Sequence, residues 1–264
     1  MIPNQIYIIL LVSIPVVFVG ATLYIISKRL RDIKAIKETP TSKITNANGY
    51  VELAGKQYSW NNNSIISPLQ KNKCSWFDYE IEVSDTSISG GFRWTTIKKG
   101  RSCAPIVLGD GSGYCLIDPE GADVVPTRER MWFGTNVDPK QGKQMNNFLG
   151  YLATIAGALI YRFHESVMFS EAHIYAIGQI ESTQVDAPKI GAWLSDYPEL
   201  SYVLKGRTIK ILSNKNLPKG RPFIISDKKE QDLLKVKRMN IFVFSLAIFF
   251  LIALGLYLTN VFYS

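Results

Sequence analysis

The sequence predicts a two-pass membrane protein, in which two α-helical transmembrane spans flank a mainly β (α+β) soluble domain. Two uncharged apolar segments near the ends of the chain, and a series of short strand patterns between them, support this fold class. Residues 6–27 and 239–264 contain no Asp, Glu, Lys or Arg, and each exceeds the roughly 20 residues that a spanning helix needs. We therefore expect transmembrane helices at residues 6–27 and 239–260, which excludes a wholly soluble protein.

The first apolar segment lacks the features of a cleavable signal peptide. No residue before Ile6 is basic, and the first lysine is Lys28. A secretory signal would begin with a basic region. We therefore expect an uncleaved membrane anchor.

Basic residues gather beside both predicted spans, on the side of the soluble domain. They are Lys28, Arg29, Arg31, Lys34 and Lys37 after the first span, and Lys228, Lys229, Lys235, Lys237 and Arg238 before the second. Because basic loops stay on the cytoplasmic side, we expect a cytoplasmic domain with both termini outside, in a bacterial inner membrane or, alternatively, an organellar membrane. These residues are a third of the 30 Lys and Arg, and they explain much of the net charge of +8. The expected partner is thus a bilayer with anionic headgroups, and not a nucleic acid.

Sequence patterns divide the segment between the spans into three parts. Residues 28–43 are expected to form a basic juxtamembrane helix and a linker, and residues 44–227 are expected to form the soluble domain. Residues 228–238 are expected to form a second basic juxtamembrane helix, which Ser226-Asp227 would cap. Short strands are predicted at residues 46–60 (around a turn at Ala54-Gly55), 74–83, 91–98, 106–108, 114–117, 122–125, 172–180, 207–212 and 222–225.

These short strands define the expected architecture of the soluble domain. The segment 74–83 is expected to pair with 91–98, and the three strands within 106–125 to form a meander. So many short strands predict a small β-barrel or sandwich, and an OB-like barrel is one form that fits.

Residues 148–161 differ from the strand patterns because all fourteen are apolar, small or uncharged. A helix of this length spans about 21 Å, which is shorter than a hydrocarbon core of about 30 Å. We expect a core helix or a membrane-interfacial helix. The small residues Gly150, Ala153, Gly157 and Ala158 leave a subunit contact open as an alternative, and a re-entrant membrane segment is another.

Residues that could carry chemistry do not form a recognisable site. Cys74, Cys103 and Cys115 are an odd number without a CxxC pair, so neither a disulfide framework nor a zinc site is expected. Cys103 could pair as a thiol with His164 or His173, oriented by Glu165 or Glu171, but no local signature surrounds it.

Two further patterns have simple structural explanations. The run Asp110-Gly111-Ser112-Gly113 could cradle a phosphate, but a tight hairpin turn explains it without a ligand. The five tryptophans, Trp60, Trp76, Trp94, Trp132 and Trp193, could stack nucleic-acid bases, but core packing or membrane anchoring is the commoner use. We therefore expect no catalytic residue, no cofactor and no metal.

Several segments resemble a known family when they are taken in order between two spans. They are SPLQKNKCSWFDYEIEV (67–83), CAPIVLGDGSGYCLIDPEGADVV (103–125), ESVMFSEAHIYAIGQIE (165–181) and RPFIISDKKEQDLLKVKR (221–238). The chain resembles the GIDE or "beside a membrane" (BAM) domain family from about Val51 to the second span. That family includes mitochondrial and chloroplast membrane-anchored RING-type ubiquitin ligases, and bacterial relatives with the domain and two spans.

The sequence departs from the ligases of this family in one respect. In those ligases a RING with Cys and His pairs holds two zinc ions after the second span, whereas here no Cys follows Cys115. We expect no RING in these residues, so the resemblance transfers no ligase activity to any of them. It implies a membrane-anchored scaffold that binds an unidentified protein partner and can form a homo-oligomer. The alternatives are a RING-less relative that takes part in ubiquitination through a partner, and a membrane hydrolase that uses Cys103.

Overall fold

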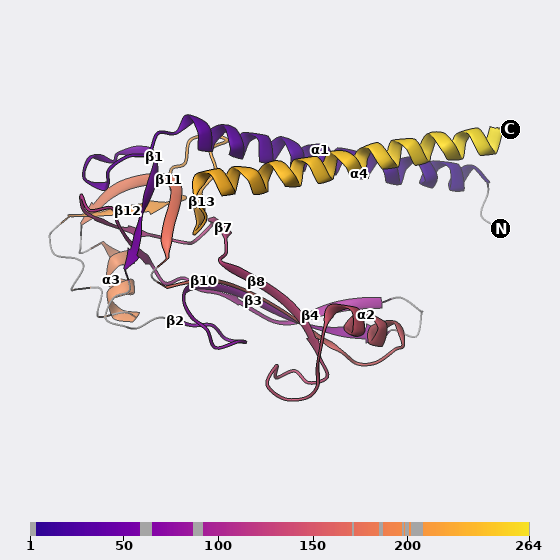
Figure 1. Ribbon diagram of the computed structural model, residues 1–264, viewed down its shortest axis with the longest axis horizontal. Helices are drawn as coiled ribbons and strands as arrows, with labels where there is room; N and C mark the ends of the chain where they lie inside the picture. The colour runs from indigo at the N-terminus through magenta and orange to yellow at the C-terminus, as the bar shows by residue number, and fades with distance from the viewer. Residues whose placement is uncertain are drawn as a thin grey trace. The chain divides into compact units, whose positions relative to one another are not determined.

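The computed structural model describes residues 4–58, 65–86, 92–170, 172–184, 187–196, 198, 201 and 208–263 (Figure 1). The chain divides into two compact units. The first comprises residues 1–39, 219–222 and 229–264, and the second comprises residues 40–218 and 223–228. The helices that carry the predicted spans lie in the first unit, and the strands form the second.

Two long helices make up most of the first unit. Helix α1 (Asn4–Glu38) and helix α4 (Glu230–Tyr263) contact each other and run antiparallel, so that the chain termini lie at the same end (Figure 1). Over Glu230–Ala253, α4 is long and apolar enough to cross a membrane. The first span stays a prediction, although residues 6–27 are helical.

The helices extend past the predicted spans as the basic patterns indicate. Helix α1 continues to Glu38 before the break at residues 39–43, and α4 includes most of residues 228–238. The predicted cap is wrong, because α4 begins only at Glu230. The hydroxyl of Ser226 instead accepts a hydrogen bond of 3.0 Å from the backbone N–H of Lys228.

The second unit contains a closed five-stranded barrel. Its strands follow the order β1 (Gly49–Tyr58), β5 (Ile106–Gly109), β6 (Tyr114–Ile117), β12 (Thr208–Ser213) and β11 (His173–Gln184), and β11 pairs again with β1. All of these pairs are antiparallel except β6–β12. Two short strands, β13 (Ile224–Ser226) and β7 (Asp123–Val125), extend the sheet from β11. The predicted small barrel is confirmed.

Strand β1 crosses the predicted turn at Ala54-Gly55 without interruption, so that turn is wrong. A Cβ atom on Gly55 would lie 2.3 Å from the backbone oxygen of Gly109 on β5. Glycine therefore allows two barrel strands to approach closely here. The barrel interior is apolar and includes Leu53, Ile117 and Leu212, all nearly inaccessible to solvent.

A second sheet forms a half-barrel in the same unit. It contains β2 (Ile65–Ile66), β3 (Lys73–Thr86), β10 (Tyr161–Phe169), β8 (Arg128–Gly134) and β9 (Gln144–Met145) in that order, and β4 (Phe92–Arg101) also pairs with β3. The predicted pairing of 74–83 with 91–98 is thus confirmed. Of the predicted 106–125 meander only β5–β6 forms, because β7 pairs in parallel with β13 instead of with β6.

The described part of this unit also contains three short helices: η1 (Ile44–Asn46), α2 (Asn147–Ile155) and α3 (Pro188–Asp196). Helix α2 is shorter than the predicted segment 148–161, whose last residue, Tyr161, already begins β10. Most of the large apolar side chains of α2 are exposed, so a core helix is wrong. Strands β8 and β10 and helix α3 were not predicted from the sequence.

Candidate functional site

A pocket of about 550 Å³ lies between the barrel and α3. Its walls come from the turn after β6, from β11, from α3 and from the end of β12. The lining residues are Asp118, Glu120, Glu181, Thr183, Ala187, Pro188, Lys189, Ile190, Ile211, Ser213, Asn214 and Lys215. Because these residues come from four parts of the sequence, only the folded barrel brings them together.

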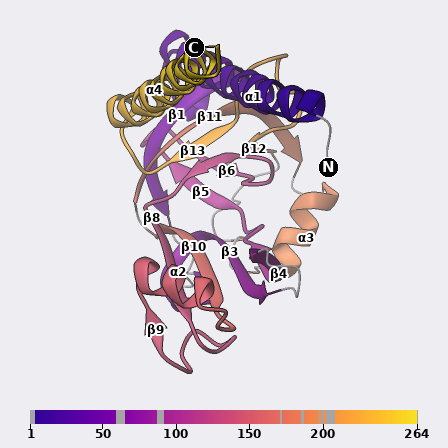
Figure 2. The ribbon, with the colours of Figure 1, turned by 90° about the vertical axis from the view of Figure 1, so that its right-hand side faces the viewer.

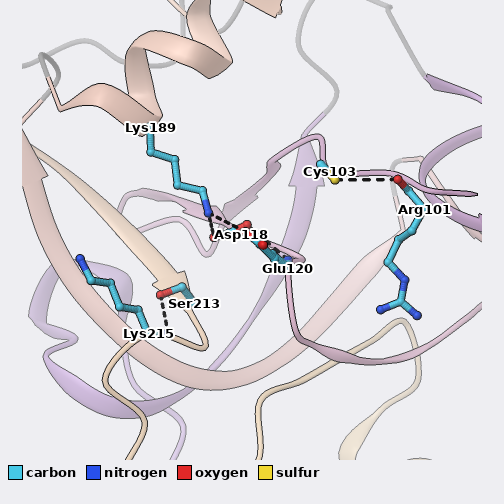
Figure 3. Close-up of polar contacts among 7 residues, drawn as sticks. All are labelled: Arg101, Cys103, Asp118, Glu120, Lys189, Ser213 and Lys215. Carbon is cyan, nitrogen blue, oxygen red and sulfur yellow. Dashed lines mark hydrogen bonds and ion pairs between the residues drawn. The ribbon is translucent and has the colours of Figure 1, made fainter.

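Lys189 on α3 binds two carboxylates of the turn after β6 (Figure 3). Its Nζ atom forms an ion pair with Asp118 and lies 3.1 Å from Oε2 of Glu120. The Asp118 side chain is buried, whereas those of Lys189 and Glu120 are largely accessible. Burial alone would lower the pKa of the Lys189 amine, but the hydrogen bonds and charges of the two carboxylates outweigh it and raise the pKa. The amine therefore stays protonated and does not act as a nucleophile.

Lys189 is positioned by the packing of its helix as well as by its ion pairs. The side chains of Ile190 and Trp193, on the same helix, are buried against Val107 and Leu116 of the barrel. Nζ of Lys189 also lies 5.4 Å from the centre of the Trp193 ring. Helix α3 is thus fixed on the barrel by its apolar face and presents Lys189 to the turn.

The opposite wall of the pocket offers further polar groups. The Ser213 hydroxyl accepts a hydrogen bond of 3.2 Å from the backbone N–H of Lys215 (Figure 3), and Glu181 accepts one of 2.7 Å from the side chain of Asn216. The pocket therefore combines three carboxylates with two amines. Such a surface suits a partner segment with charged and hydrogen-bonding groups. In the described part of the chain, no group of three or more His, Cys, Asp or Glu side chains could hold a metal ion.

The structure does not assemble the thiol–base pair considered from the sequence. Cys103 is exposed, and its Sγ atom lies 3.8 Å from the backbone oxygen of Arg101 (Figure 3). Nε2 of His164 pairs with Glu129 at 2.7 Å, and His173 is exposed at the start of β11. Among the described contacts, no hydrogen bond joins Cys103 to either histidine.

The two carboxylates considered as orienting groups do not support a catalytic role either. Glu165 is buried and accepts hydrogen bonds from the backbone N–H groups of Leu69 at 2.7 Å and Gln70 at 3.1 Å. Its charge is therefore satisfied by a loop of the half-barrel. Glu171 lies outside the described residues.

The Asp110–Gly113 segment is the hairpin turn between β5 and β6, as predicted. One carboxylate oxygen of Asp110 accepts hydrogen bonds from the backbone N–H of Ser112 and Gly113, and the other accepts one from Ile44. Burial alone would raise the pKa of Asp110, but these bonds and one from the Ser112 hydroxyl lower it to about 2. The donors that could have bound a phosphate are thus already used by Asp110.

The tryptophans serve mainly as packing residues. Trp76, Trp132 and Trp193 are buried, and the ring of Trp94 lies under the guanidinium of Arg162, at 4.4 Å from its central carbon. Trp60 lies outside the described residues. Buried rings cannot stack on bases, so packing is the use that the described rings support.

Helix α3 was not predicted from the sequence, so the pocket that it lines was not predicted either. Pro188 stands at the first position of this helix, where proline is favoured, and Trp193 follows at a spacing that buries it on one face. These two signals could have located the helix. The ion pair to Asp118 could not have been found in the same way, because it joins residues 71 positions apart.

A comparison with known protein families matches a segment that contributes most of the lining residues of this pocket. Residues 79–195 match the GIDE family model, whose description is E3 ubiquitin ligase. The matched region begins in β3 and ends in α3, and it contains Asp118, Glu120 and Lys189. Neither a curated protein nor a solved structure matches the chain. The chain therefore carries a GIDE domain, related to E3 ubiquitin ligases, at residues 79–195.

Proposed function

We propose that the protein is a two-pass membrane scaffold that holds its GIDE domain at the membrane surface and binds a protein partner there. The observation that carries this proposal is the antiparallel pairing of α1 and α4, with the barrel and half-barrel inserted between them in sequence. A domain attached at both ends in this way is suited to presenting a fixed surface.

The anchor is supported by the exposed side chains of both helices. On α4, Phe249 and Phe250 are 70% and 74% exposed, and on α1, Val17 and Tyr24 are 71% and 65% exposed. Soluble proteins rarely expose such continuous apolar surface, whereas lipid would cover it. Because α1 contacts α4, a bilayer around α4 would also reach α1, which supports a membrane span in α1 as well.

The binding role is supported by the chemistry of the pocket. Lys189 is held as a cation by Asp118 and Glu120, and Cys103 lacks a histidine partner, so the arrangement lacks an activated nucleophile. Charged groups fixed on a rigid barrel can instead recognise a partner of complementary charge. A polypeptide segment bound across Lys189 and the two carboxylates is the ligand that fits this surface.

Strand connectivity supports an OB-like barrel as the scaffold of this surface. The barrel has five strands, a single parallel pair (β6–β12) and long insertions between neighbouring strands, as expected for a Greek-key barrel. The carboxylates of the pocket would repel a phosphate backbone. We therefore propose a protein ligand and not a nucleic acid.

Site-specific photocrosslinking tests the partner site directly. A photoreactive amino acid at Thr183, which lines the pocket from β11, is introduced into the full chain in its native membrane. The matched control is Gln184, the next residue of the same strand, which is exposed and points to the other face. We expect a discrete crosslinked polypeptide from Thr183, and none from Gln184.

A charge reversal makes this experiment specific. Lys189→Glu places a third carboxylate beside Asp118 and Glu120, so it should abolish the Thr183 crosslink. Equal crosslinking at both positions, or a crosslink that survives Lys189→Glu, would contradict the proposed partner site. A strictly monomeric protein without any copurified partner in mild detergent would contradict the scaffold itself.

The second candidate function follows from the family match. A protein with a GIDE domain could take part in ubiquitination through a partner that supplies the catalytic module. Reconstitution of the full chain with ubiquitin, activating enzyme and conjugating enzyme tests this role. Ubiquitin chains that depend on the protein would favour it, and no chains even in the presence of the crosslinked partner would remove it.

A further inference from the structure

Helix α2 carries an apolar stripe that none of the described residues of its unit covers. Phe148, Leu152 and Ile155 are 70%, 46% and 66% exposed, and Leu149 is 49% exposed. The helix lies at one end of the half-barrel, beside β8 and β9 (Figure 2). These positions are three or four residues apart, so the side chains line one face. Contiguous exposed apolar patches of this kind mark interaction surfaces.

The packing of α2 explains why this face points outward. A Cβ atom on Gly150 would lie 2.1 Å from Cγ of Phe133 on β8, so the helix backbone rests directly on that ring. Thr154, one turn later, is also buried. The Asn146 side chain caps the helix by accepting a hydrogen bond of 2.9 Å from the backbone N–H of Leu149. The half-barrel therefore fixes the small face of α2 and leaves the large apolar face free.

Two lysines precede the stripe, in a loop that also contains Asp138. Residues 139–164 include Lys140, Lys143 and Arg162 but no Asp or Glu, and both lysines are exposed in the loop before α2. Arg162 is engaged with Glu82 at 2.6 Å. An exposed apolar face bordered by lysines matches the pattern of helices that lie in a membrane interface. Anionic headgroups complement the lysines, and acyl chains complement the stripe.

We infer that α2 is an interfacial membrane contact, which inserts its stripe into a bilayer with anionic headgroups. The inference rests on the proposed anchoring, because the helices α1 and α4 hold the domain at high local concentration near the lipid surface. Nine residues make a helix of about 14 Å, which is too short to span a membrane but suits one that lies along its surface. Of the small residues that could form a subunit contact, Gly150 already packs on Phe133 and is not available to a second copy.

Fluorescence quenching from lipid tests this inference on the full chain. In a Cys103→Ala background, a polarity-sensitive dye is attached to Leu152→Cys, and the protein is reconstituted into vesicles of phosphatidylcholine and phosphatidylglycerol that contain a nitroxide-labelled lipid. Ser112→Cys, in the exposed β5–β6 turn, is the matched control, and Leu246→Cys on α4 reports the anchor. We expect quenching at Leu152 at least twofold above that at Ser112, and strong quenching at Leu246.

The outcomes separate this inference from the proposed anchoring. Quenching at Leu246 together with an unquenched, water-exposed dye at Leu152 would overturn the α2 contact and leave the anchor intact. Absence of quenching at both positions would overturn both. Disulfide dimers through Leu152→Cys without lipid quenching would assign the stripe to a second copy. Vesicles of phosphatidylcholine alone should lower the quenching at Leu152 at least twofold. The double variant Lys140→Gln with Lys143→Gln should have the same effect. Unchanged quenching in either experiment would contradict the role of charge.

Discussion

Lys237 of α4 and Asp32 of α1 form a buried ion pair, with 2.9 Å between Nζ and Oδ2 and side-chain exposures of only 2% and 5%. The two residues are 205 positions apart, so they join the two ends of the chain. Arg29 adds a weaker contact at 3.9 Å from the same carboxylate oxygen. One of the basic residues that the sequence analysis assigned to lipid headgroups is therefore neutralised inside the helix pair.

Asp32→Asn should destabilise the pairing of α1 and α4 by about 3 kcal/mol, because it leaves the Lys237 ammonium buried without its counter-charge. The measurement is the free energy of unfolding of the full chain in mild detergent. The double variant Asp32→Leu with Lys237→Met should recover most of the loss, since an apolar pair of similar volume avoids burying a charge.

The matched control is the exposed ion pair of Lys34 and Glu38, whose charged atoms lie 3.8 Å apart on α1. Lys34→Gln should change the free energy of unfolding by less than about 0.5 kcal/mol. If Lys34→Gln lowers the free energy of unfolding as much as Asp32→Asn does, helix α1 is sensitive to any change of charge. The buried pair would then have no special role.

Gly150→Ala should destabilise the half-barrel by about 1 to 3 kcal/mol, because the added methyl group would overlap the ring of Phe133 and force α2 away from β8. Gly191→Ala is the control, since this glycine also lies in a helix but has open space around it. The control should be neutral or more stable by up to about 1 kcal/mol. Thermal unfolding of both variants measures the difference, and equal effects would contradict the close packing of α2.

The ionised Asp110 carboxylate should stabilise the fold at pH values above its ordinary pKa of 3.8. This stabilisation should be lost as the pH falls toward about 2. The sign follows from the lowered pKa, because protonating the folded carboxyl requires breaking its hydrogen bonds with Ile44, Ser112 and Gly113. Asp110→Asn should therefore be less stable than the native protein at pH 7, and the difference should vanish near pH 2. A difference that is the same at both pH values would contradict this role; unfolding midpoints across the range provide the test.

The three cysteines should differ in reactivity. Burial, with a smaller contribution from the charge of Glu165, raises the pKa of Cys74 to about 12, and burial with the charge of Asp110 raises that of Cys115 to about 12. Cys103 is exposed. At pH 8 a maleimide should label one thiol in the folded chain and three after denaturation, as counted by mass. Rapid labelling of a second thiol without unfolding would contradict the burial.

Local patterns predicted the elements whose signals are contained in a few neighbouring residues. The alternation in 74–83 identified β3, and the turn at Asp110–Gly113 identified the β5–β6 hairpin. The uncharged segment 239–264 identified the apolar part of α4. Each of these depends on side-chain period or turn chemistry, which the sequence displays directly.

Features that depend on distant partners could not be predicted in this way. Gly55 has the character of a turn residue, but its function is to admit the backbone of Gly109 from another strand. The 148–161 segment was predicted to be a core helix or a membrane-interfacial helix because its residues are apolar, and the fold buries only the small face of α2. Lys237 was predicted to face lipid headgroups, but in the structure it forms an ion pair with Asp32.

Thiol labelling of intact cells tests the central claim, which is a two-pass anchor with the GIDE domain on the cytoplasmic side. In a Cys103→Ala background, Asn4→Cys, Ser112→Cys and Ser264→Cys are exposed separately to a membrane-impermeant maleimide. The account predicts labelling of Asn4→Cys and Ser264→Cys in intact cells, and labelling of Ser112→Cys only after the cells are opened. Labelling of Ser112→Cys in intact cells, or of only one terminal position, would contradict it.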